Sequence, residues 1–156
     1  MDIYEKQRFV FGSLFLLANR LQVVGDQYLA KDDMTTKQWF LSVVISQFRD
    51  HAPTLSEVAE LMGSSRQNVK QLALKLAEKE FLTIEKDAKD ARALRLVLTE
   101  KSQHFWDGRQ EQDDRFIREL FRDIGGEEMD ALARAIGAMI ERTGQMARRA
   151  PIGEEE

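Results

Sequence analysis

Apolar residues recur every three or four positions near the start of the chain and predict one long helix. Between Ile3 and Ala30 this spacing is followed by Phe9, Val10, Leu14, Leu17, Leu21, Val24 and Tyr28. Such a stripe places apolar side chains on one face of a helix and polar side chains on the other. The polar pair Asp32-Asp33 interrupts the stripe. We therefore expect an amphipathic helix over roughly residues 3–30.

Three further helix starts are marked by a hydroxyl residue that is followed three positions later by Glu or Gln. In such a capping box the two side chains satisfy backbone N–H groups of the first helical turn. The pairs are Thr35 with Gln38, Thr54 with Glu57, and Ser64 with Gln67. Gly63, just before the third start, has the backbone freedom that a sharp turn needs. The last two helices and the turn between them predict a helix-turn-helix, whose second helix can enter the major groove of DNA.

After Phe81 the spacing of apolar residues changes from helical to alternating, which is typical of strands. The alternating apolar residues are Leu82, Ile84, Leu94, Leu96 and Leu98. The polar segment 87–93 between the two runs suits an exposed hairpin loop. A hairpin that follows a helix-turn-helix is a wing.

The C-terminal part predicts two more helices. Thr99 is expected to cap one long helix that carries Phe105, Trp106, Phe116, Ile117, Leu120 and Phe121. Gly125-Gly126 breaks the chain, and a last helix carries Met129, Leu132, Ala133, Ile136 and Ile140. The acidic tail, residues 149–156, is expected to be disordered.

The pattern as a whole predicts a mainly α fold with a small β-hairpin. We expect a single domain over residues 1–156, with a winged helix-turn-helix lobe at about 35–100. The helices at about 1–32 and 101–148 extend past such a lobe, and their apolar stripes need a covering surface. The simplest cover is a second copy, and a two-fold dimer would place two recognition helices about 34 Å apart on one DNA face. The alternative is that these helices pack only within their own chain.

Charge and composition narrow the classes of function. The net charge is −4, but residues 64–101 hold nine Lys or Arg against six Asp or Glu, a local +3 that favours DNA. There is no Cys, and His51 and His104 are too few for a convincing zinc cluster, so we expect no metal or cofactor. No apolar run reaches the ~18 residues of a membrane span and no signal peptide is recognisable, so we expect a cytoplasmic protein without a membrane partner. The chain lacks a credible nucleophile–base pair or phosphate-binding glycine loop, so an enzyme is not expected.

Three segments of the chain form a recognisable combination: TTKQWFLSVV at Thr35–Val44, TLSEVAELMGSSRQNVKQL at Thr54–Leu72 and DARALRLVLTEKS at Asp90–Ser102. Together they resemble the multiple-antibiotic-resistance regulator (MarR) family of winged-helix transcription factors. The resemblance implies an obligate homodimer that binds a pseudo-palindromic operator in double-stranded DNA. It also implies repression that is usually relieved by a small ligand. The chain departs from the family at Glu80 and Ser102, where members usually have Gly. A left-handed Glu80 would cost about 1 kcal/mol, so we expect the helix before it to end differently.

The resemblance also implies which residues meet DNA. The groove-facing end of the recognition helix would carry Ser65, Arg66, Gln67, Asn68 and Lys70, with Ser64 beside it. Lys89 and Arg92 would contact DNA from the wing, Arg92 in the minor groove with Asp90 holding its guanidinium group.

The side chains have suitable chemistry for these roles. Arg66 can read guanine or bind a phosphate, and Gln67 and Asn68 can read adenine. Ser64 and Ser65 suit phosphate beside a helix N-terminus, although Ser64 equally suits a capping role.

An effector site is the least constrained expectation. Five aromatic residues could line a cavity for an aromatic or lipophilic ligand between the dimer helices and the DNA lobe: Phe15, Trp39, Phe40, Phe48 and Trp106. Aromatic residues at helical spacing are more often plain core, and we favour that interpretation. A different class of function, a winged-helix module that binds protein and not DNA, is the alternative. The salt dependence of duplex binding separates the two.

Overall fold

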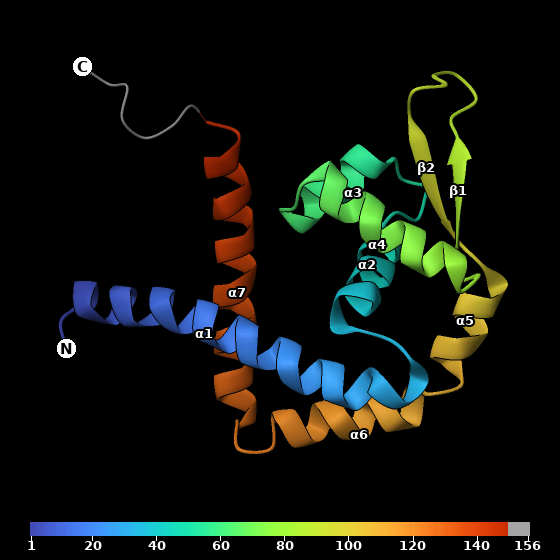
Figure 1. The fold of residues 1–156 in the computed structure, drawn as a ribbon. Helices are drawn as coiled ribbons and strands as arrows, with labels where there is room; N and C mark the ends of the chain where they lie inside the picture. Colours follow the sequence, from blue (N-terminus) through green and yellow to red (C-terminus); the bar gives the residue numbers. More distant parts are fainter. Residues whose placement is uncertain (150–156) are drawn as a thin grey trace. The chain divides into compact units, whose positions relative to one another are not determined.

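The computed structural model describes residues 1–149 and divides the chain into two compact units (Figure 1). The first unit is Met1–Gly108 and the second begins at Arg109. The first contains α1 (Ile3–Leu29), the 3-10 turn η1 (Ala30–Asp32), α2 (Thr36–Ser46), α3 (Leu55–Met62), α4 (Arg66–Glu78), β1 (Leu82–Lys86), β2 (Leu94–Leu98) and α5 (Glu100–Asp107). The second contains α6 (Gln110–Leu120) and α7 (Gly126–Ala147). The expected tail lies, from residue 150 on, outside the described residues.

The starts of α2 and α3 are the capping boxes that the sequence predicts. Thr35 with Gln38 and Thr54 with Glu57 each exchange the two side-chain-to-backbone hydrogen bonds. The third expected box, Ser64 with Gln67, is wrong by one residue. The backbone N–H of Ser64 is used to close the preceding helix, donating to the carbonyl of Ala59 at 3.0 Å. The next helix therefore begins one residue later, with Ser65 as its N-cap.

Three helical segments of the first unit end in the same closure, in which one left-handed residue reverses the chain. Two hydrogen bonds that run back across the last turn define this Schellman motif. The left-handed residues are Asp33 (φ 53°), Gly63 (φ 62°) and Glu80 (φ 61°). At the end of α4, the N–H of Phe81 donates to the carbonyl of Leu76 at 2.9 Å, and that of Glu80 donates to Ala77 at 2.9 Å.

Glu80 therefore adopts the strained conformation that the sequence analysis expected the chain to avoid. Two contacts to the segment after β2 hold it in place. Thr99 Oγ1 donates to the Glu80 carbonyl at 2.7 Å, and Lys101 Nζ donates to Glu80 Oε2 at 3.0 Å. The compact turn is retained because the apolar residues that follow, Phe81 and Leu82, are buried by it.

The wing is a two-stranded antiparallel hairpin with a third, very short edge partner. β1 and β2 pair from Leu82↔Leu98 to Lys86↔Leu94. On the other side of β2, the N–H of Leu96 donates to the carbonyl of Pro53 at 2.9 Å, and an isolated bridge joins Thr54 to Arg95. The α2–α3 connection thus runs along the outer edge of β2, which joins the wing to the start of the helix-turn-helix.

One apolar core fills the first unit and determines how α4 is rotated. Val69, Ala73 and Leu76 are completely buried on its inner face. α4 packs against α2, α3 and β1. Fully burying a side chain of this size stabilises the fold by ~1.5–3 kcal/mol, so a different rotation of α4 is strongly disfavoured. The opposite face of α4 must then face solvent.

The expected long helix from Thr99 through Phe121 is wrong, because it is broken in two. α5 ends at Asp107 and α6 begins at Gln110. Gly108 is a weak helix former, and Arg109 leaves helical geometry with φ −113° and ψ 5°. The expected break before the last helix is confirmed: Gly125 is the N-cap of α7.

The strain at Glu80 leads to a stability prediction. Glu80→Gly should raise the free energy of unfolding by about 1 kcal/mol, because Gly adopts a positive φ without steric cost. Glu78→Gly is the matched control in the helical part of α4 and should lower the same quantity by a similar amount. Urea unfolding followed by circular dichroism measures both. Destabilisation by both variants would show that the left-handed turn stores no strain.

Candidate nucleic-acid interface

The N-terminal end of α4 presents a cluster of polar side chains to solvent. The exposed residues are Ser65, Arg66, Gln67, Asn68 and Lys70, while Ser64 is half-buried. All but Ser64 belong to α4 or to its N-cap. Val69, which stands between Asn68 and Lys70 in the chain, is buried in the core. The residues that the sequence predicts to meet DNA on this helix are therefore accessible, except Ser64, which is half-buried.

The two serines have different roles at this end. The Ser65 hydroxyl accepts the N–H of Asn68 at 3.1 Å, so it is the capping residue. Ser64 belongs to the turn, and its hydroxyl is not the cap. The N–H groups of Arg66 and Gln67 come first in the helix, where no helical carbonyl can accept them. Such groups, with the positive end of the helix dipole, favour an anion.

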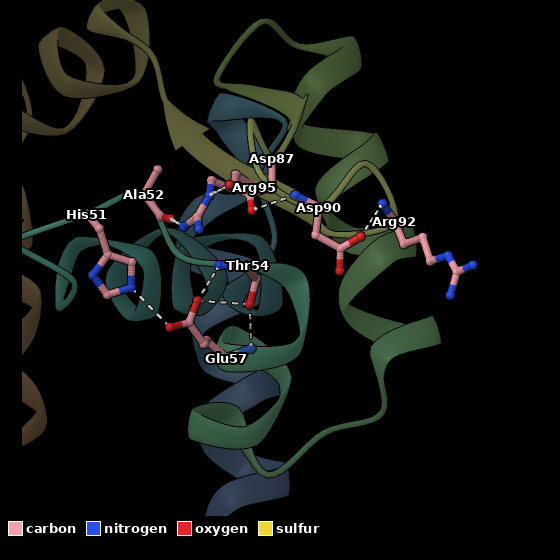
Figure 2. A network of polar contacts seen from close by, with 8 residues as sticks. All are labelled: His51, Ala52, Thr54, Glu57, Asp87, Asp90, Arg92 and Arg95. Carbon is pink, nitrogen blue, oxygen red and sulfur yellow. Dashed lines mark hydrogen bonds and ion pairs between the residues drawn. The ribbon is translucent and has the colours of Figure 1, made fainter.

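Arg92 lies near the tip of the wing, with its guanidinium group directed away from Asp90 (Figure 2). Asp90 does not hold that group, contrary to the expectation. Asp90 Oδ1 instead accepts the backbone N–H of Arg92 at 2.9 Å. A carboxylate two residues before its partner forms a local turn more readily than it reaches the end of an extended arginine. Arg92, with Lys89 on the same exposed loop, is left projecting into solvent.

The base of the wing is held by an ion pair between Asp87 and Arg95. Arg95 Nε lies 2.7 Å from Asp87 Oδ1, and the two side chains are only 30% and 15% exposed. Arg95 Nη1 also donates to the carbonyl of Ala52 in the α2–α3 connection. The hydrogen bond between the pair lowers the pKa of Asp87 and raises that of Arg95.

A second polar cluster lies at the start of α3 (Figure 2). Glu57 Oε2 accepts the backbone N–H of Thr54 at 2.7 Å and the Thr54 hydroxyl at 2.8 Å. His51 Nε2 lies 3.0 Å from Glu57 Oε1. The backbone hydrogen bond from Thr54 is the largest cause that lowers the pKa of Glu57. The short segment 52–54 is thus held at both ends. Arg95 contacts the carbonyl of Ala52 at one end, and Glu57 holds Thr54 at the other.

Arg95 and Asp87 are the residues that the sequence analysis missed. Because Arg95 alternates with Leu94 and Leu96, the sequence pattern predicts a solvent-facing residue on the second strand but no partner for it. A usable signal was present, since opposite charges stand on either side of a hairpin loop. The attachment to Ala52 had no such signal, because it joins positions that are distant along the chain.

The five aromatic residues proposed for an effector cavity differ in their surroundings within the first unit. An open depression of about 390 Å³ lies between the end of α2, the α2–α3 connection and β2, and only Phe48 of the five lines it. Phe15 is exposed and contacts Phe11, while Trp106 stacks edge-on against Phe105 beside the core. Trp39 and Phe40 are 38% and 41% exposed on α2.

In the described part of the chain, residues 1–149, no group of three or more His, Asp or Glu side chains is placed to hold a metal ion. Likewise, none of the helices within it is long and apolar enough to cross a membrane.

The arrangement of α2, α3, α4 and the hairpin defines a winged helix-turn-helix protein. Among proteins of that class, the chain has the fold of MarR-family transcriptional regulators. The transcriptional regulator BldR from Sulfolobus solfataricus matches with a TM-score of 0.78 at 13% identity, covering 91% of this chain and 99% of that one. A MarR/EmrR-family regulator from Acinetobacter sp. ADP1 matches with 0.73 at 19% identity, over 89% and 97%.

A third match is the complex of MepR from S. aureus with DNA, with a TM-score of 0.72 at 19% identity, over 85% and 97% of the two chains. No protein-family sequence model and no curated protein matches the chain. At these identities the likeness is one of fold.

The Asp87–Arg95 pair leads to a pH prediction. The pKa of Asp87 is lowered from 3.8 in the folded protein, so its ionised form adds stability that is lost as the pH falls through the folded value. Asp87→Asn should therefore lower the urea midpoint at pH 7, and the gap from wild type should narrow as the pH falls below about 4. Asp114→Asn, which removes an exposed carboxylate from α6, is the matched control at pH 7. A gap that stays constant down to pH 3 would contradict an ionic role for Asp87.

Proposed function

We propose that the protein is a sequence-specific DNA-binding transcriptional regulator. The observations that carry the proposal are the exposed polar end of α4 and the exposed wing arginine, on a fold shared with transcriptional regulators. That the solved MepR structure is a complex with DNA supports the same conclusion.

The end of α4 would enter the major groove. Arg66 suits the O6 and N7 acceptors of guanine or a phosphate, and Gln67 and Asn68 suit adenine. Gln67 lies on the side of α4 opposite the buried Val69, and Arg66 and Asn68 are exposed in the first turn of the helix. The unpaired N–H groups at the helix start and the exposed Lys70 would bind phosphate and set the register. The main role of Ser65 is to cap α4, since its hydroxyl accepts the N–H of Asn68.

The wing would reach the adjacent minor groove with Arg92. Arginine is favoured where A·T-rich sequence narrows this groove and strengthens its negative potential. Lys89 on the same loop would add a phosphate contact. The hydrogen bond from the Arg92 backbone to Asp90 would shape the loop without occupying the guanidinium group.

The protein would act as a homodimer on a pseudo-palindromic operator. Large apolar side chains of α1 are exposed along its length, among them Phe9, Leu16, Leu17, Leu21 and Val24. α7 exposes Leu132, Ile136, Met139 and Ile140. A second copy would cover such faces, and two-fold symmetry would pair two recognition helices with two half-sites.

Repression released by a small ligand is the finer part of the proposal. It rests on the family resemblance and on the depression next to the α2–α3 connection. An aromatic or lipophilic compound bound there would contact Phe48, Leu96 and Leu98, and could displace the segment that carries the start of α3. The five aromatic residues of the original expectation do not support it as a group.

Binding to DNA is expected to depend on the wing arginine. Arg92→Ala should weaken operator binding about tenfold or more, because it removes a charge from the minor groove. The measurement is fluorescence anisotropy with a duplex that the wild-type protein selects from a random-sequence library. Thermal unfolding and molecular mass should stay unchanged.

Arg122→Ala is the matched control, since it removes an exposed arginine from the segment between α6 and α7. It should keep the wild-type affinity. A steep fall of wild-type affinity with salt is also expected. Failure to enrich or bind any duplex at low ionic strength would favour the alternative, a winged-helix module that binds another protein.

The dimer leads to a separate prediction. Sedimentation equilibrium should give twice the chain mass of 18.0 kDa. Leu17→Glu places a charge on the exposed apolar stripe of α1 and should shift the protein toward single chains. Asn19→Glu adds a charge of the same sign on the other side of the helix and should leave the dimer intact. A wild-type protein that sediments as one chain would rule out this mode of operator binding.

A further inference from the structure

Arg95 makes polar side-chain contacts that link the wing to the start of the helix-turn-helix (Figure 2). It is the second residue of β2, with Glu85 as its partner on β1. Its guanidinium group reaches Asp87 at the start of the wing loop and the carbonyl of Ala52 in the α2–α3 connection. Its charge is also attracted to Glu57, in the first turn of α3.

The backbone makes the same connection at the same place. Thr54, the N-cap of α3, forms the isolated bridge with Arg95. The Arg95 Nε–Asp87 Oδ1 distance is 2.7 Å, and the pair is partly buried, so salt screens it less than a fully exposed pair. A rotation of the wing relative to α3 would have to break both sets of contacts.

From Asp87 a series of hydrogen bonds leads to the wing tip. Asp87 Oδ2 accepts the backbone N–H of Asp90 at 3.3 Å, and Asp90 Oδ1 accepts that of Arg92 at 2.9 Å. The loop is closed at its base, where the N–H of Asp87 donates to the carbonyl of Ala93 at 3.0 Å. The position of Arg92 is therefore tied to the residue that Arg95 holds.

We propose that Arg95 is a positioning residue, which acts through Asp87 to hold Arg92 at the distance from α4 that one DNA duplex requires. Arg95 itself would not contact DNA, because its guanidinium group is engaged within the lobe. This inference rests on the proposed function, since it concerns how the two DNA-contacting parts are kept in register.

The role differs measurably from simple stabilisation of the fold. If Arg95 acts by placing Arg92, its loss matters only while Arg92 can contact the minor groove. If Arg95 only stabilises the lobe or binds DNA directly, its loss costs the same with or without Arg92. A double-mutant cycle separates these cases.

The experiment measures the affinity of the full-length protein for the selected duplex by anisotropy. Arg95→Met keeps the apolar stem and removes the charge, and it should weaken binding about fivefold in the otherwise wild-type protein. In the Arg92→Ala background the same change should weaken binding less than about twofold. Lys86→Met, which removes a charge from the same hairpin outside the Asp87 contact, should cost the same in both backgrounds.

Asp87→Asn provides the second variant, because it breaks the same pair without placing a new apolar group in the lobe. It should show the same dependence on Arg92, which keeps the test valid if Arg95→Met does not fold. Equal costs in both backgrounds for either folded variant would overturn the positioning role. A wild-type protein that selects no duplex would overturn the proposed function instead.

Discussion

The rotation of α4 about its own axis is the constraint on which the remaining features of the lobe depend. Val69, Ala73 and Leu76 are buried against α2, α3 and β1, and burying them contributes several kcal/mol that any other rotation would lose. Because the inner face is occupied by apolar side chains, polar side chains on the other side of the helix, such as Gln67, must face solvent. The exposed surface that we assign to DNA follows from what the core requires.

The wing is positioned by a different kind of interaction. Two strands of five residues form a small sheet that is only marginally stable alone. Its outer edge is covered by Pro53 and Thr54, and its loop is anchored by Asp87 and Arg95. A partly buried ion pair gives little net stability, since its attraction is offset by desolvation. Its geometry is specific, however, and specificity of position is what a residue at the wing tip needs.

Much of the fold could be predicted because its signals are local. The caps at Thr35 and Thr54, the turn at Gly63 and the alternation of apolar residues in both strands each depend on residues a few positions apart. The predictions were wrong where two local signals competed for one residue, or where residues distant in the chain determined the local backbone conformation. Ser64 has the residue type of a cap but serves the turn before it, and Glu80 accepts a left-handed conformation because Thr99 and Lys101 hold it.

In the candidate site, too, some features could be predicted from local sequence and others depend on distant contacts. The residues on α4 and at the wing tip were identifiable from residue type, helical spacing and the family resemblance. The actual partner of Asp90 and the pairing of Asp87 with Arg95 were not. The register of the hairpin and the path of segment 52–54 decide which side chains meet, and both are set by packing in the lobe.

By itself, the sequence determined the order and type of most elements, the inner and outer faces of α4, and the location of the basic segment. These depend on spacing and charge, which are properties of neighbouring residues. Only the tertiary structure decided that Arg95 joins the wing to the start of α3, and that α5 ends at Asp107. Contacts between residues forty or more positions apart, as between Arg95 and Ala52, leave no periodic trace in a chain, because they form only when the core has brought the segments together.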